Sequence, residues 1–137
     1  MPMEIPDETV IVADNDSMMR GLLRTTLERR RRILRLCADG AEAVEMAAET
    51  VATLVLLDLR MPRMDGLEAC RAIRALPGYD GVPIVILTAF DDMQSRNRAM
   101  RAGATSFLVK PVSRDQLTRT IGPLIEARKQ IQELEYY

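Results

Sequence analysis

The chain contains no histidine and only two cysteines among its 137 residues. A Ser-His-Asp triad and a metal site with imidazole ligands are therefore excluded within this chain. Cys37 and Cys70 lie in apolar or helical stretches, and their spacing does not suggest metal ligands. We expect both to be buried free thiols of a protein from a reducing compartment.

The sequence also has no apolar run close to the roughly 20 residues that span a bilayer. Its start, "MPMEIPDE", is short and acidic and does not resemble a signal peptide. The 19 basic and 20 acidic residues give a net charge of −1, so bulk affinity for nucleic acid is not expected. These features predict a cytoplasmic protein that makes no direct contact with membranes or nucleic acid.

Short apolar runs alternate along the chain with segments of helical periodicity. The runs "LVLL" and "IVIL" have no polar alternation, which is typical of parallel strands covered on both faces. Five units of strand and helix in a chain of this length predict one α/β domain with an open, doubly wound parallel sheet. The predicted strands comprise residues 10–13, 33–37, 54–57, 84–87 and 107–109.

Polar side chains follow four of these predicted strands. The acidic turn Asp14-Asn15-Asp16 follows the first strand, Asp58 the third, Thr88 the fourth and Lys110 the fifth. In doubly wound sheets the ligand sites lie at the carboxyl ends of the strands, so these side chains are expected to meet. Two chemistries fit the acidic turn. Asp14 could be a nucleophile with Asp16 as its acid partner, or the turn could hold a metal ion for Asp58.

Asp58 suits the role of a phosphoryl acceptor if the charge repulsion is neutralised. A carboxylate that attacks phosphorus is repelled by the phosphoryl oxygens, and a divalent cation and a lysine relieve this repulsion. Mg²⁺ prefers hard oxygen ligands, which Asp14, Asn15 and the backbone carbonyl of Arg60 can supply. Lys110 adds a fixed positive charge, and the Thr88 hydroxyl can donate to a phosphate oxygen.

Three strings after the acidic turn, "LLDLRMPRMDG" (56–66), "ILTA" (86–89) and "LVKPV" (108–112), resemble the receiver domain of two-component response regulators. The resemblance covers roughly residues 9–122 and implies the flavodoxin-like (CheY-like) sheet with strand order 2-1-3-4-5. It implies that Asp58 takes a phosphoryl group from the phosphohistidine of a sensor histidine kinase or phosphotransfer protein. Mg²⁺ would be held by Asp14, Asn15, Asp58 and the Arg60 carbonyl.

The same resemblance implies a switch. Thr88 and Lys110 would read the phosphate, and Phe107 would move with Thr88 to remodel the face formed by helix 4, strand 5 and helix 5, about residues 91–125. A cis Lys110–Pro111 bond is also implied. The expected activity is that of a switch and not of an enzyme, with only self-phosphotransfer and self-dephosphorylation.

Two positions depart from the family pattern. Asn15 stands where a second acid is usual, so weaker Mg²⁺ binding is expected. Phe90, two residues past Thr88, is expected to slow dephosphorylation. Asn15 also motivates an alternative, a pseudo-receiver that binds partners without being phosphorylated. A further alternative follows from "VIVADNDSM", which resembles the first motif of haloacid-dehalogenase-type phosphohydrolases that would use Asp14 and Asp16.

The two ends of the chain are expected to lie outside this domain, as an N-terminal extension (1–8) and a C-terminal helical extension (123–137). Gly122-Pro123 should kink or restart the last helix. The extension either lies on the domain or forms a stalk that dimerises or leads to an output domain. "QELEYY" resembles the stalk of diguanylate-cyclase regulators. A homodimer would use this helix or the face of helix 4, strand 5 and helix 5.

Overall fold

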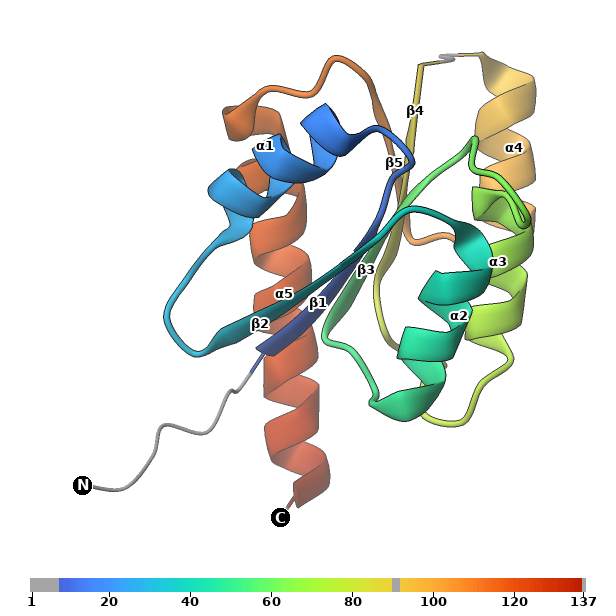
Figure 1. The fold of residues 1–137 in the computed structure, drawn as a ribbon. Coiled ribbons are helices and arrows are strands. Elements are labelled where there is room, and N and C mark those ends of the chain that lie inside the picture. Colours follow the sequence, from blue (N-terminus) through green and yellow to red (C-terminus); the bar gives the residue numbers. More distant parts are fainter. Residues whose placement is uncertain (1–7, 90–91, 137) are drawn as a thin grey trace.

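In residues 8–89 and 92–136, which the computed structural model describes, five strands and five helices alternate (Figure 1). The strands are β1 (Glu8–Ala13), β2 (Arg32–Cys37), β3 (Leu54–Asp58), β4 (Ile84–Thr88) and β5 (Ser106–Val109). The helices are α1 (Ser17–Leu27), α2 (Gly40–Glu49), α3 (Gly66–Arg74), α4 (Met93–Arg101) and α5 (Arg114–Tyr136). The strands form one parallel sheet in the order β2-β1-β3-β4-β5. The predicted fold class and strand order are therefore confirmed.

Helices cover both faces of this sheet, with α1 and α5 on one side and α2, α3 and α4 on the other (Figure 1). Successive residues of a strand point to opposite faces. Val10 and Val12 accordingly pack with residues of α1 and α5, whereas Ile11 and Ala13 pack with residues of α2 and α3. Every residue of β3 and β4 is buried, which explains why these strands lack polar alternation. Each large apolar side chain buried in this way contributes about 1.5–3 kcal/mol.

Aspartates cap the first turns of four helices. The carboxylates of Asp16, Asp39, Asp65 and Asp92 accept hydrogen bonds from backbone N–H groups of α1, α2, α3 and α4. At α3 the cap is reciprocal, because the Glu68 side chain accepts from the backbone N–H of Asp65. Such caps are typically worth about 1 kcal/mol each. They fix the residue at which each of these helices begins.

The last helix is continuous from Arg114 to Tyr136, with Pro123 inside it. The sequence predicts a kink or a restart at Gly122-Pro123, and of these two outcomes the restart is wrong. Proline removes one helical hydrogen bond, yet Ile121 and Ile125 on either side of it are both buried against the sheet. Pro123 itself is exposed, and the packing of the two isoleucines stabilises the helix on either side of it.

The continuation of α5 is tied to the amino ends of the strands. Lys129 Nζ lies 3.1 Å from Glu8 Oε1, and Arg32 Nε lies 2.6 Å from Glu8 Oε2. Burial raises the pKa of the Glu8 carboxyl, but its bonds to Arg32 and Lys129 outweigh this, and the pKa is lowered overall. Beyond Lys129 the helix leaves the body, since Ile131 is 44% exposed and Leu134 is 77% exposed. The start of the extension therefore lies on the domain, while its last turns present apolar side chains to solvent.

None of the helices in the described ranges combines the length and apolar character needed to cross a membrane.

Candidate functional site

The carboxyl ends of β1, β3 and β5 bring three of the predicted site residues into direct contact. Lys110 Nζ lies 2.9 Å from Asp14 Oδ2 and 3.2 Å from Asp58 Oδ1. Asp14 and Lys110 are 96 residues apart in the sequence, so only the parallel sheet brings them together. The sequence-based expectation that these groups meet at one edge is confirmed.

The two carboxylates are almost completely removed from water. Asp14 is 0% exposed and Asp58 is 6% exposed. Burial raises the pKa of Asp58 and the charge of Asp14 raises it further, and Lys110 offsets only part of the effect. Burial lowers the pKa of Lys110, but its bonds to Asp14 and Asp58 outweigh this and raise it overall. Lys110 is thus held as a cation, and two carboxylates share it.

A glycine holds Asp58 in place from the following loop. Gly66 N–H donates to the Leu59 carbonyl at 2.9 Å. A Cβ atom added to Gly66 would lie 2.3 Å from the backbone oxygen of Asp58, a distance that no side chain tolerates. The "MDG" of the sequence motif is therefore explained by packing: Asp65 caps α3, and Gly66 lets the helix start directly against the backbone of Asp58.

Asn15 lies next to two of the three other candidate metal ligands, Asp58 and the Arg60 carbonyl. In the amide orientation that satisfies both ends, its nitrogen lies 3.3 Å from the Arg60 carbonyl oxygen and 3.2 Å from Asp58 Oδ2. Half a turn of the amide presents the Asn15 oxygen to the same region. Within the described ranges no group of three or more His, Cys, Asp or Glu side chains could hold a metal ion. A cation bound here would need the amide and the carbonyl besides the two carboxylates, and this all-oxygen set fits Mg²⁺.

Thr88 and Phe107 lie on the two neighbouring strands at this edge. Thr88 is the last residue of β4 and is 1% exposed. On β5, Phe107 pairs with Ile86, which lies two residues before Thr88. The half-buried Phe107 ring packs against the core beneath α2, α3 and α4. The Arg96 guanidinium of α4 lies 5.0 Å from the ring centroid, which is a cation–π contact. Sequence reasoning missed Arg96, because the placement of α4 over β5 is decided only by tertiary packing.

Two residues of the acidic turn and α1 have structural roles. The Asp16 carboxylate accepts from Met18 N–H at 2.9 Å as the cap of α1, while its backbone N–H donates to Asp14 Oδ1 at 2.9 Å. Arg20, which the sequence analysis did not single out, donates from Nη1 to the Asp14 carbonyl at 2.6 Å. Both interactions hold Asp14 in position. An arginine near the start of an amphipathic helix carries little sequence signal, because most such residues are simply solvated.

The Lys110–Pro111 peptide bond is cis, as the family resemblance implies. Phe90, and residue 91 at the start of the predicted switch face, lie outside the described residues.

Comparison with known proteins supports the same family. The model of the response regulator receiver domain matches residues 10–122. Response regulator MprA of Mycobacterium ulcerans is 37% identical over 120 residues, which cover 88% of this chain and 51% of MprA. The chain thus spans about half the length of the curated relatives it matches.

Solved structures resemble the whole domain. The receiver domain of sensor histidine kinase PA1611 from Pseudomonas aeruginosa has a TM-score of 0.80 and 29% identity, over 87% of this chain and 98% of that one. Its crystal structure has a magnesium ion coordinated in the active site cleft. Chemotaxis protein CheY4 of Vibrio cholerae has a TM-score of 0.80 and 28% identity, over 85% of this chain and 98% of that one. Since the family match runs from β1 into α5, the chain belongs to the response regulator receiver domain family.

Proposed function

We propose that Asp58 accepts a phosphoryl group with the help of Mg²⁺, and that this modification switches the domain. The observation that carries the proposal is the position of Lys110, whose ammonium contacts both Asp14 and Asp58 at the carboxyl edge of the sheet. A lysine shared by two buried carboxylates is weak evidence of a role in stability. Its ammonium is well placed to neutralise the oxygens of an incoming phosphoryl group.

The proposed chemical step is the transfer of a phosphoryl group from a nitrogen of the donor to Asp58. An Asp58 oxygen forms the new bond to phosphorus as the bond from phosphorus to the donor nitrogen breaks, and the electron pair leaves with the imidazole of the donor. Lys110 neutralises negative charge on the transferring oxygens, and the Thr88 hydroxyl can donate to one of them. Bound Mg²⁺ would supply further charge neutralisation, with Asp14, Asn15, Asp58 and the Arg60 carbonyl as its protein ligands.

Thr88 ends β4, the strand next to the one that ends in Asp58, and Phe107 of the following strand β5 contacts Arg96 of α4. A phosphoryl group adds about −1.5 to −2 charge and new acceptor oxygens, which would attract the Thr88 hydroxyl. A shift of Thr88 changes the space beside Phe107, and the ring contacts Arg96 of α4. We infer that the face formed by α4, β5 and α5 reports the phosphorylation state.

The phosphoryl donor is proposed to be a sensor histidine kinase or a phosphotransfer protein. Helix α1 starts directly after the acidic turn, and it exposes Met18 (82%) and Leu22 (53%). Exposed apolar side chains on the helix that follows the acidic turn give a donor a surface on which to dock.

Further partners follow from the exposed end of α5 and from the length of the relatives. Ile131 and Leu134 offer a seam for a homodimer or for a stalk to an output domain, the diguanylate-cyclase type being one candidate. The face of α4, β5 and α5 is the alternative dimer surface. The proposed role is that of a cytoplasmic switch, without turnover of a separate substrate and without direct contact with nucleic acid.

The proposal is tested by incubating the protein with acetyl phosphate and Mg²⁺ and measuring the intact mass. We expect an adduct of one phosphoryl group. We expect no adduct to form when the metal is chelated, because the buried carboxylates then repel the donor. Borohydride reduction followed by peptide mass mapping should place the modification on Asp58. If no adduct forms and Mg²⁺ binding is undetectable, the domain is a pseudo-receiver.

Asn15→Asp is expected to strengthen Mg²⁺ binding roughly tenfold, or about 1.4 kcal/mol. An aspartate at this position adds a charged oxygen ligand next to Asp58 and the Arg60 carbonyl, whereas the amide offers only a dipole. The affinity can be measured by calorimetric titration with MgCl₂. Asn97→Asp, an exposed site on α4, is the matched control and should leave the affinity unchanged. An unchanged affinity in Asn15→Asp would show that residue 15 does not ligate the ion.

A further inference from the structure

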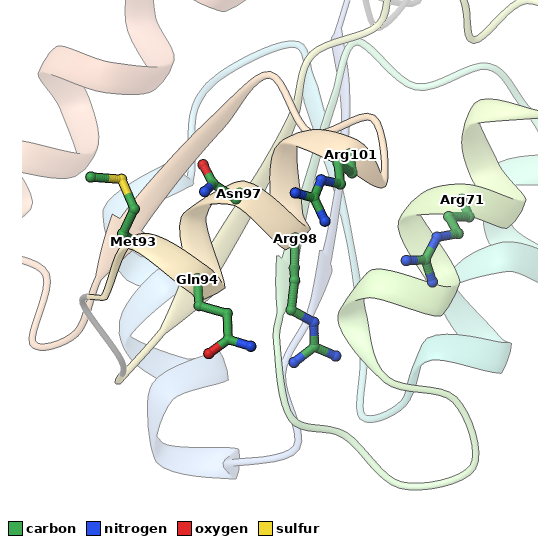
Figure 2. Close-up of a pocket in the computed structure, with 6 residues that line it drawn as sticks. All are labelled: Arg71, Met93, Gln94, Asn97, Arg98 and Arg101. Atoms are coloured by element: carbon green, nitrogen blue, oxygen red, sulfur yellow. The ribbon is translucent and has the colours of Figure 1, made fainter.

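A surface groove of about 660 Å³ lies between α3 and α4, and Figure 2 shows the side chains that line it. Gln94, Asn97, Arg98 and Arg101 follow one another at the spacing of a single helical face, and Arg71 reaches the groove from α3. Met93 completes the lining. None of these six residues belongs to the proposed phosphorylation site, so the groove is a separate feature of the surface.

The groove has three guanidinium groups and no carboxylate in its lining. Within the part of the chain that the structure describes, Arg71, Arg98 and Arg101 form no ion pair. Arg74, one turn after Arg71, is different, because it donates to the carbonyls of Gly103 and Val82 and so ties loops together. The three groove arginines have no such structural role to account for them.

A simpler explanation covers only part of this arrangement. Basic residues in the last turn of a helix interact favourably with its dipole, and Arg98, Arg101 and Arg71 are in such turns. The dipole explains their presence on each helix. It does not explain why the arginines of two helices converge on one groove, where they repel one another unless an anion lies between them.

The character of the lining indicates which kind of anion fits. All six lining side chains are exposed, so the groove cannot enclose a small molecule in the way that a ligand pocket does. Guanidinium groups form bidentate hydrogen bonds with carboxylates. The side-chain amides of Gln94 and Asn97 can form hydrogen bonds with a peptide backbone. Met93, 74% exposed, offers an adaptable apolar contact at the end of the groove.

We propose that this groove is a docking surface for an acidic segment of a partner protein, with aspartate or glutamate side chains paired to Arg71, Arg98 and Arg101. The surface requires no phosphorylation of Asp58. Five of its six lining residues are on α4, whose Arg96 contacts Phe107, so a docked segment would contact the same helix as the proposed switch.

The test uses the whole chain and a fluorescein-labelled peptide of ten glutamates, with binding followed by fluorescence anisotropy at low salt. The test variant is Arg71→Gln/Arg98→Gln/Arg101→Gln. The matched control is Arg24→Gln/Arg29→Gln/Arg114→Gln, which removes three exposed arginines elsewhere and changes the net charge equally. We expect about tenfold weaker binding in the test variant and less than twofold in the control.

Three results would overturn the proposal: no saturable binding of the glutamate peptide to the wild type, equal weakening in both triple variants, or binding of inorganic tripolyphosphate but not of the peptide. The last would assign the groove to a small anion. Thermal melting followed by circular dichroism checks that both variants fold, which is expected because every substituted side chain is exposed.

Discussion

Replacing Asp58 with asparagine is expected to abolish the phosphoryl adduct that acetyl phosphate and Mg²⁺ form on the wild type. The neutral amide has no carboxylate oxygen to attack phosphorus, although it keeps the shape of the side chain and a partner for Lys110. Because Asp58 is 6% exposed and lies at the end of a buried strand, an isosteric change disturbs the packing least. Intact-mass measurement over a time course of hours gives the readout.

Two further aspartates serve as matched comparisons for this result. Asp14→Asn should slow adduct formation without abolishing it, since it weakens the cation site and leaves the acceptor in place. Asp16→Asn should behave like the wild type, because the Asp16 side chain caps α1 and asparagine caps equally well. An adduct that persists in Asp58→Asn but disappears in Asp14→Asn would instead support the phosphohydrolase alternative, with Asp14 as the nucleophile.

Lys110→Met is expected to slow phosphorylation by acetyl phosphate at least about a hundredfold, which is the usual loss for one preorganised electrostatic group. The variant removes the charge shared by Asp14 and Asp58 and keeps an unbranched side chain of similar length. Since Lys110 lowers the pKa of Asp58, its loss should raise that pKa further. Quenched time points analysed by mass spectrometry give the rate.

A second readout of the same variant should move in the opposite direction. Without the lysine ammonium the two carboxylates exert an uncompensated negative potential, so Mg²⁺ should bind more tightly while phosphorylation slows. A misfolded protein would lose both properties together. Lys129→Met is the matched control, because Lys129 is the only other lysine of the chain and pairs with Glu8 at the far end of the strands. A normal phosphorylation rate in Lys110→Met would refute the proposed role of Lys110.

Much of this molecule follows from the sequence, because the informative patterns are local. The buried runs "LVLL" and "IVIL" predict central parallel strands, and the structure confirms them as β3 and β4 with every residue buried. Once five parallel strands are in place, their carboxyl ends must share one edge. The contact between Lys110 and the carboxylates of Asp14 and Asp58 was therefore predictable before any distance was known.

Other features depend on how elements lie against one another, and the sequence does not encode them in any short pattern. Asp16 looks like a catalytic acid in the sequence, yet the direction in which α1 leaves the strand makes it a helix cap. Pro123 predicts a break, yet the burial of Ile121 and Ile125 on the sheet keeps α5 in one piece. Local propensity is worth a few kcal/mol at most, and tertiary packing of buried side chains overrides it.

The sequence by itself determined the fold and the contact between Asp58 and Lys110, since strand burial and the polar residues at strand ends are properties of short segments. Only the tertiary structure decided the contact of Arg96 with Phe107 and the convergence of Arg71, Arg98 and Arg101 on one groove. Both arise from the rotation and placement of α4 against β5 and α3. That placement depends on the sum of many side-chain contacts and has no signature in α4 alone.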